Sequence, residues 1–180
     1  MHLREGDTVL DLGGGTGLSF AYLQKRIGPR GRIIALDYTG AMLEQAAKKA
    51  EKHGWQNVTL IQGDAAKVKE LVATPVNATL SAFCLSLVPG WQQAIAGTAD
   101  LLQAGGRFVV LDWRTMKARG PMRTLSPVLE WLTKRYGLAD PSVNFTEERP
   151  WCDVMGMYLT GVTYQDMHMG TTFLCSGAKG

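Results

Sequence analysis

The sequence has few cysteines and no long apolar run. Three of its 180 residues are cysteine, and Cys84, Cys152 and Cys175 are widely spaced. An odd number at this spacing argues against a disulfide scaffold and a Cys-x-x-Cys metal site, and it predicts free thiols in a reducing compartment. No apolar run approaches the roughly 18 residues of a membrane-spanning helix, and the first residues lack a signal-peptide core. We therefore expect a cytoplasmic protein.

The sequence also has little excess charge. A formal net charge of +3 is too small to indicate a nucleic-acid partner by itself. Hydrophobic residues make up 46% of the chain and charged residues 19%, which is typical of a globular protein. A chain of this length can bury a core of its own, so we expect one domain over residues 1–180.

What the sequence does contain is a glycine-rich loop near its start. Residues 8–17 read Thr-Val-Leu-Asp-Leu-Gly-Gly-Gly-Thr-Gly, and their apolar part predicts a strand buried on both faces of a parallel sheet. Three glycines allow positive φ and a close approach of the backbone to a ligand: Gly13, Gly15 and Gly17. A helix expected over residues 18–27 would direct its N-terminal amides toward that ligand.

The spacing of the loop distinguishes it from two nucleotide-binding motifs. A dinucleotide fingerprint needs glycine at position 18 or 20, where this chain has Leu18 and Phe20. A P-loop needs a lysine that is absent here, since the first lysine is Lys25. Instead Asp11 stands two residues before Gly13. An acid at that place suits a positively charged ligand and disfavours a pyrophosphate.

The acid-led loop from Asp11 to Gly17 resembles the first motif of the class I S-adenosylmethionine-dependent methyltransferases. The resemblance extends from about Thr8 to Gly177. It implies an α/β fold with a doubly wound, Rossmann-like, mostly parallel seven-stranded sheet and a C-terminal antiparallel hairpin, for which residues 158–165 and 171–176 supply the strands. It also implies S-adenosyl-L-methionine as the cofactor.

Two further acids are expected to hold this cofactor. Asp37 ends a predicted strand over residues 32–37, close to the offset at which an acid binds ribose hydroxyls in nucleotide-binding units. Asp64 follows a third predicted strand, and the resemblance implies that it accepts from the adenine amino group while the amide of Ala65 meets a ring nitrogen. The aromatic faces of Tyr38 and Phe83 are expected near the sulfonium cation.

The reaction site is expected at the ends of the next two strands, over residues 78–83 and 107–113, the second preceded by a turn over residues 103–106. The carboxyl ends of parallel strands line the ligand crevice, so Phe83, Cys84 and Leu85 should form its floor. Cys84 has no base nearby in the sequence, which argues against a nucleophilic role.

Residues 112–135 carry six basic residues against two acids. A helix led by Pro121 is expected there, and its apolar stripe either packs on the sheet or rests on an anionic lipid surface. The polar residues 141–151 are predicted to be a lid.

The acceptor is indicated less specifically. Residues 85–91, the Asp112–Trp113 pair and the Pro121-led basic helix look similar to methyltransferases of phospholipid and betaine-lipid amines, and quinone methyltransferases are close neighbours. We therefore expect methyl transfer to a small-molecule or lipid head-group acceptor at an amine, with C- or O-methylation of the quinone type as the alternative. Peripheral contact with a membrane is compatible with a lipid head-group acceptor. No metal is required. Late-chain candidates for a base are Tyr136, Tyr158, Tyr164 and His168, each more typical of a structural role.

Two other function classes stay open. One is a nicotinamide-dependent oxidoreductase, against which the missing fingerprint glycine and the terminal hairpin argue. The other is a binding module without catalysis. The family usually carries helices before its first strand, so the short lead-in over residues 1–7 predicts a trimmed chain or an open site. The sequence names neither the acceptor atom nor an oligomeric state.

Overall fold

The computed structural model describes residues 1–113, 131, 150–167 and 172–180. Its centre is a seven-stranded sheet with the strand order β3-β2-β1-β4-β5-β7-β6. The strands are β1 (Thr8–Leu12), β2 (Arg32–Asp37), β3 (Val58–Gln62), β4 (Val76–Ala82), β5 (Leu102–Trp113), β6 (Thr160–Met167) and β7 (Thr172–Ala178). Strands β1 to β5 are parallel, and β7 lies antiparallel between β5 and β6. The Rossmann-like methyltransferase fold expected from the sequence is confirmed.

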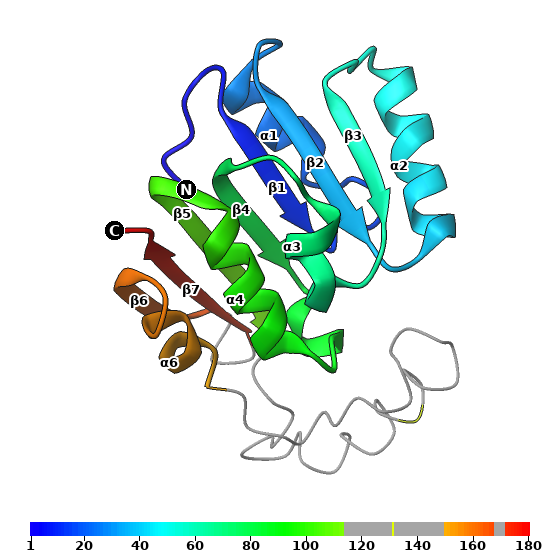
Figure 1. Cartoon of the computed structure of the whole chain (residues 1–180). Helices are drawn as coiled ribbons and strands as arrows, with labels where there is room; N and C mark the ends of the chain where they lie inside the picture. Colours follow the sequence, from blue (N-terminus) through cyan, green and yellow to red (C-terminus); the bar gives the residue numbers. More distant parts are fainter. Residues whose placement is uncertain (114–130, 132–149, 168–171) are drawn as a thin grey trace.

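Helices cover both faces of this sheet (Figure 1). They are α1 (Phe20–Ile27), α2 (Gly40–Lys52), α3 (Val68–Leu71), α4 (Trp91–Leu101) and α6 (Trp151–Gly156), with 3-10 turns η1 (Ala65–Lys67) and η2 (Leu85–Leu87). Alternate residues of the central strands serve the two faces because successive side chains of a strand point to opposite sides. Val9 of β1 packs with residues of α1 and α2, whereas its neighbour Leu10 packs with residues of α4.

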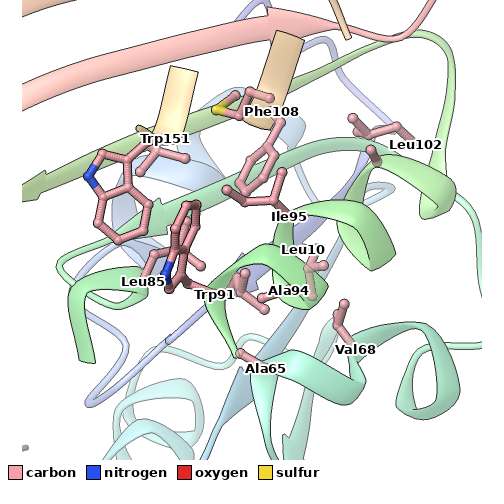
Figure 2. Packing of buried hydrophobic residues seen from close by; sticks show 14 of the residues in the cluster. Leu10, Ala65, Val68, Leu85, Trp91, Ala94, Ile95, Leu102, Phe108 and Trp151 are labelled. Atoms are coloured by element: carbon pink, nitrogen blue, oxygen red, sulfur yellow. The ribbon is translucent and has the colours of Figure 1, made fainter. Parts of the chain in front are cut away.

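The larger core cluster lies between α4, α6 and the sheet (Figure 2). The Trp91 and Trp151 rings meet edge to face with centroids 4.9 Å apart, and Ile95 and Phe108 are fully buried beside them. A helix in a protein is stabilised mostly by packing of its apolar face against the rest of the core, and less by the helix propensity of its residues. The core therefore fixes α4 against β4 and β5, the two strands that lead to the expected reaction site.

The element boundaries differ from the sequence prediction in two places. Helix α1 begins at Phe20, not at residue 18, because the Gly17 N–H closes a turn onto the Gly14 carbonyl at 2.9 Å. Strand β5 begins at Leu102 and includes the residues expected as a turn, with a register shift against β4 at Val76/Ala78 and a positive φ of 74° at Gly105. The C-terminal hairpin is confirmed.

The prediction of three free thiols is wrong for two of them. Cys152 of α6 and Cys175 of β7 form a disulfide, with Cα atoms 6.2 Å apart. They are 23 residues apart in the chain, so the sequence offered no motif that pairs them. The sheet brings them together because β7 inserts beside β5, below α6. Cys84 is the free cysteine.

Two predicted segments lie almost entirely outside the described residues. The Pro121-led basic helix is described only at Trp131, and the lid over residues 141–151 only at its last two residues, of which Trp151 begins α6. Within the described part of the chain, no helix is both long enough and apolar enough to cross a bilayer.

The core predicts a stability effect at Ile95. Ile95→Ala should lower the free energy of unfolding by about 2–5 kcal/mol, because it removes a fully buried side chain and leaves a cavity beneath α4. Urea unfolding followed by circular dichroism measures the change. Met157→Ala is the control, since Met157 is 74% exposed and should change stability by no more than about 0.5 kcal/mol. Equal effects of the two substitutions would contradict this packing.

Candidate functional site

The glycine-rich loop, residues 13–17, joins β1 to α1 at the carboxyl edge of the sheet. Gly13, Gly15 and Gly17 have φ values of 78°, 52° and 69°, in the left-handed region that favours glycine. A Cβ built on Gly15 would meet only the Gly13 carbonyl oxygen, at 3.9 Å. The loop therefore presents an open backbone surface at Gly15, as the sequence predicted.

The amides of this loop are directed into the protein. The Gly13 and Gly14 N–H groups donate to the Leu36 carbonyl at 2.8 and 3.1 Å, and the Gly17 N–H donates to the Gly14 carbonyl. A phosphate-binding loop instead offers such amides to its anion. Because these donors are used internally, the loop does not fit a pyrophosphate, in agreement with the argument from its spacing.

Asp37 is held at the centre of this edge. One carboxylate oxygen accepts the Gly15 N–H and the other accepts the Thr39 N–H, both at 2.8 Å. The Asp37 carbonyl accepts the Gly63 N–H at 2.9 Å, which links β2 to the turn that carries Asp64. Each carboxylate oxygen retains a further lone pair. The bonds therefore orient Asp37 while leaving it able to accept from ribose hydroxyls.

Asp64 and Ala65 lie at the start of η1. The Asp64 Oδ1 atom caps this turn by accepting the Ala66 N–H at 2.9 Å, and the Ala65 side chain is buried in the core. The second carboxylate oxygen of Asp64 remains available geometrically for an amino donor, because the cap engages Oδ1. Asp64, expected to bind the base, and Asp37, expected to bind the sugar, are thus held close together by the hydrogen bond from the Gly63 N–H to the Asp37 carbonyl.

Asp11 lies beneath the loop and is only 2% exposed. Its Oδ2 atom accepts from the Ser19 hydroxyl, at the residue that precedes α1. Burial raises the pKa of Asp11 to about 6, the bond from Ser19 opposes that rise, and the negative charge of Asp37 adds to it. The geometry ties the end of β1 to the start of α1, and a direct contact of Asp11 with a ligand stays a prediction.

Cys84 packs directly against the loop. A Cβ built on Gly13 would lie 2.5 Å from the Cys84 sulfur and closer still to its Cβ, so only glycine fits at position 13. Burial raises the pKa of the Cys84 thiol, and the negative charges of Asp112, Asp37 and Asp11 raise it further. A thiolate is therefore disfavoured here, which agrees with the sequence argument against a nucleophile.

The expected floor of the site needs a correction at one of its three residues. Phe83 is 39% exposed at the end of β4, and Tyr38 is 76% exposed at the end of β2, so both can meet a ligand. Leu85 is fully buried in the main core cluster, because η2 folds it back toward Trp91. The prediction that Leu85 lines the reaction site is wrong.

The candidates for a base late in the chain are either placed on or near β6 or lie outside the described residues. The Tyr164 hydroxyl donates to Asp166 at 2.6 Å on β6, and Tyr158 is 42% exposed just before that strand. Tyr136 and His168 lie outside the described residues. Within the described ranges, no three His, Cys, Asp or Glu side chains are grouped so that they could hold a metal ion.

Sequence reasoning missed the structural role of Asp112. This fully buried carboxylate ends the apolar run of β5 and accepts the Ser86 N–H at 3.0 Å and the Trp113 N–H at 2.8 Å. It thereby fastens the end of β5 to the turn after β4. The available signal was an apolar strand ending in aspartate, the same pattern that Asp11 and Asp37 show.

The packing of Gly13 on Cys84 gives a matched comparison of two glycines. Gly13 and Gly105 have φ values of 78° and 74°, but a Cβ on Gly105 would meet nothing within 4 Å. Gly105→Ala should therefore show the backbone cost alone, about 1–2 kcal/mol of unfolding free energy. Gly13→Ala should cost about 1–3 kcal/mol more, because it adds a steric clash.

Urea unfolding of both variants measures this difference. Cys84→Gly removes the clashing atoms, so combining it with Gly13→Ala should give a favourable coupling energy in a double-mutant cycle. Equal costs for the two alanine substitutions, or strict additivity with Cys84→Gly, would contradict the close contact.

Asp11 predicts a pH dependence of stability. The pKa of Asp11 is about 6 in the folded state against an ordinary value of 3.8, so between about pH 4 and pH 6 the folded state holds a proton that the unfolded state releases. This carboxyl therefore lowers stability as the pH rises through that window. Asp11→Asn removes the effect, and relative to wild type it should gain up to about 3 kcal/mol between pH 4 and pH 7.

Urea unfolding of both proteins at several pH values tests the sign. Asp100→Asn is the control, because the hydrogen bond from Lys69 lowers the pKa of Asp100, so this exposed acid should show a small dependence of opposite direction. A difference between Asp11→Asn and wild type that does not change with pH would show that Asp11 is not held in a costly buried state.

The chain is similar to known methyltransferases in sequence and in fold. The model of a family described as "Methyltransferase domain" matches residues 3–136. A ubiquinone/menaquinone biosynthesis C-methyltransferase UbiE of Enterobacter sp. is 32% identical over 139 residues, 74% of this chain and 49% of that protein. An arsenite methyltransferase of Halobacterium salinarum is 31% identical over 107 residues, 59% of this chain and 27% of that protein. The chain thus spans half or less of the length of these curated relatives.

A solved structure agrees on the fold. A SAM-dependent methyltransferase from Aquifex aeolicus superposes with a TM-score of 0.66 at 21% identity, over 99% of this chain and 85% of that chain. The family match covers most of the chain, and the glycine loop and Asp37 fit the expected cofactor. This chain belongs to the class I S-adenosylmethionine-dependent methyltransferases, whose cofactor is S-adenosyl-L-methionine.

Proposed function

We propose that this protein transfers the methyl group of S-adenosylmethionine to a small-molecule acceptor of the quinone-ring type. The observation that carries the proposal is Asp37, which is bound to the glycine-rich loop on one side and to the Gly63 turn on the other. This arrangement brings the candidate sugar, base and methionine positions to one edge of the sheet, the edge at which ligands bind in open α/β folds.

The residues of the chain have separate roles in this proposal. Asp37 would accept the ribose hydroxyls, Asp64 and the Ala65 amide would meet the adenine, and the open backbone at Gly15 would face the methionine part. Tyr38, the exposed residue after Asp37, would place its ring near the sulfonium cation. The cofactor supplies a methyl group that its sulfonium cation already activates, so the protein mainly aligns the acceptor with it.

The electrostatics of the edge favour a cationic ligand. Asp37 accepts the Gly15 N–H, Asp11 is buried beneath the same loop, and Asp112 accepts the Ser86 N–H two residues after Cys84, which packs on Gly13. Besides burial, the negative charges of these three carboxylates raise the pKa of Cys84. A negative potential in a partly desolvated site stabilises a cation and disfavours an anion. The loop therefore suits a sulfonium better than a phosphate.

The acceptor part of the proposal draws on the relatives. Several relatives are named as ubiquinone/menaquinone biosynthesis C-methyltransferases, and the Enterobacter protein shares 32% identity with this chain over 139 residues. The amine acceptor expected from the sequence depended partly on the Pro121-led basic helix, which lies almost entirely outside the described residues. That acceptor, and the membrane contact that goes with it, stay predictions.

Binding of the product S-adenosylhomocysteine tests the cofactor site. Isothermal calorimetry should show binding to the wild type, and Asp37→Ala should weaken it at least about tenfold, since a hydrogen bond to a charged group contributes about 1.5–3 kcal/mol. Asp100→Ala, at an exposed acid on α4, should bind like the wild type. No binding by the wild type, or equal binding by Asp37→Ala, would contradict the assignment.

Methyl transfer from labelled cofactor distinguishes the acceptors in the same preparation. Label should pass to 1,4-dihydroxynaphthalene, a ring of the quinol type, and remain after treatments that remove labile O-methyl groups. Transfer to phosphatidylethanolamine vesicles instead of to the ring would replace this proposal with the amine acceptor.

A further inference from the structure

Two aromatic side chains stand side by side at the carboxyl ends of β4 and β5. The rings of Phe83 and Trp113 lie with centroids 5.0 Å apart and planes tilted by 43°. Phe83 is 39% exposed and Trp113 is 50% exposed, so each ring is partly covered by the other and partly accessible to a ligand. Exposed single aromatics are common on proteins and need no explanation, but here two exposed rings lie together at the edge of the sheet where ligands bind in open α/β folds.

The backbone holds this pair in place. Phe83 has a φ of 55°, rare for a residue with a side chain, and its N–H donates to the Leu111 carbonyl at 2.8 Å. The Trp113 N–H donates to the buried Asp112 carboxylate, whose other oxygen accepts the Ser86 N–H. Both aromatic residues are thus fixed from below by hydrogen bonds between the two strand ends, which limits the entropy lost when a ligand binds.

The pair also lies beside the loop assigned to the methyl donor. Phe83 immediately precedes Cys84, and Cys84 packs against Gly13 of that loop. The chain of contacts from Trp113 through Phe83 and Cys84 to Gly13 stays on the carboxyl edge of adjacent strands, in the order β5, β4, β1. A molecule resting on the pair would therefore adjoin the donor side of the site.

We propose that Trp113 and Phe83 form the binding platform for the methyl acceptor, and that the platform selects a planar aromatic ring by stacking. The inference rests on the proposed function and adds to it the residues that recognise the acceptor. Tryptophan and phenylalanine faces favour offset or tilted contact with another flat ring over contact with a saturated ring of equal size. Trp113 is the residue that sets this preference, because it is the more exposed of the two.

Two small probes of the same carbon skeleton test the preference. Calorimetry with 2-naphthol and with decahydro-2-naphthol, each in the presence of saturating S-adenosylhomocysteine, gives the ratio of the two affinities. The wild type should prefer the planar probe by about 2- to 10-fold, the range expected for one aromatic contact. Trp113→Ala should lose the preference, and Trp113→Phe should keep most of it.

The ratio separates recognition from a structural role, since a general disturbance of the site would weaken both probes alike. Trp113→Leu is a second variant that keeps apolar volume without a ring, and it should also lose the preference. Tyr22→Ala is the matched control, because Tyr22 is 52% exposed but packs under Arg26 on α1. It should keep the ratio of the wild type.

The outcomes distinguish this inference from the function on which it rests. A wild type that binds S-adenosylhomocysteine but shows no planar preference, or a preference that survives Trp113→Ala and Trp113→Leu, overturns the platform and leaves the cofactor site intact. A wild type that fails to bind S-adenosylhomocysteine overturns the proposed function itself.

Discussion

The bond between the Gly15 N–H and the Asp37 carboxylate is the interaction on which the arrangement of this site depends. It joins the first loop to the end of the neighbouring strand, and the Asp37 carbonyl extends the connection to Gly63. These bonds connect the carboxyl ends of three neighbouring strands, β1, β2 and β3. Hydrogen bonds to an ionised group are stronger than neutral ones, so this link is well suited to fix a loop built mostly of flexible glycines.

The same edge of the sheet carries an electrostatic cost. Burial, with the negative charge of Asp37 in addition, raises the pKa of Asp11, so its ionised form is unfavourable there. Carboxylates with strongly shifted pKa values cluster at functional sites. Here the charges of Asp11, Asp37 and Asp112 act together on one small region, and a sulfonium ligand bound there would offset part of the repulsion. Stability without ligand and affinity for a cation thus oppose each other.

The fold and the cofactor edge were largely predictable from the sequence. Apolar runs such as residues 32–37 end in an acid, and the glycine spacing excluded two other nucleotide-binding loops, so local pattern sufficed. The predictions that Leu85 lines the site and that Cys152 and Cys175 are free thiols were wrong, because both features depend on how distant segments pack. The role of Trp113 also needed the structure, since only the pairing of β4 with β5 brings it to Phe83.

The contact between Gly13 and Cys84 has a consequence for how such a chain can change over generations. The two positions are 71 residues apart in sequence, but a Cβ at position 13 would overlap the Cys84 side chain, so position 13 has no room for a side chain while Cys84 is present. Selection on the acceptor side, through the residue after Phe83, is therefore coupled to selection on the donor loop. Since the left-handed backbone also favours glycine at position 13, the residue after Phe83 is restricted to side chains that keep clear of that glycine.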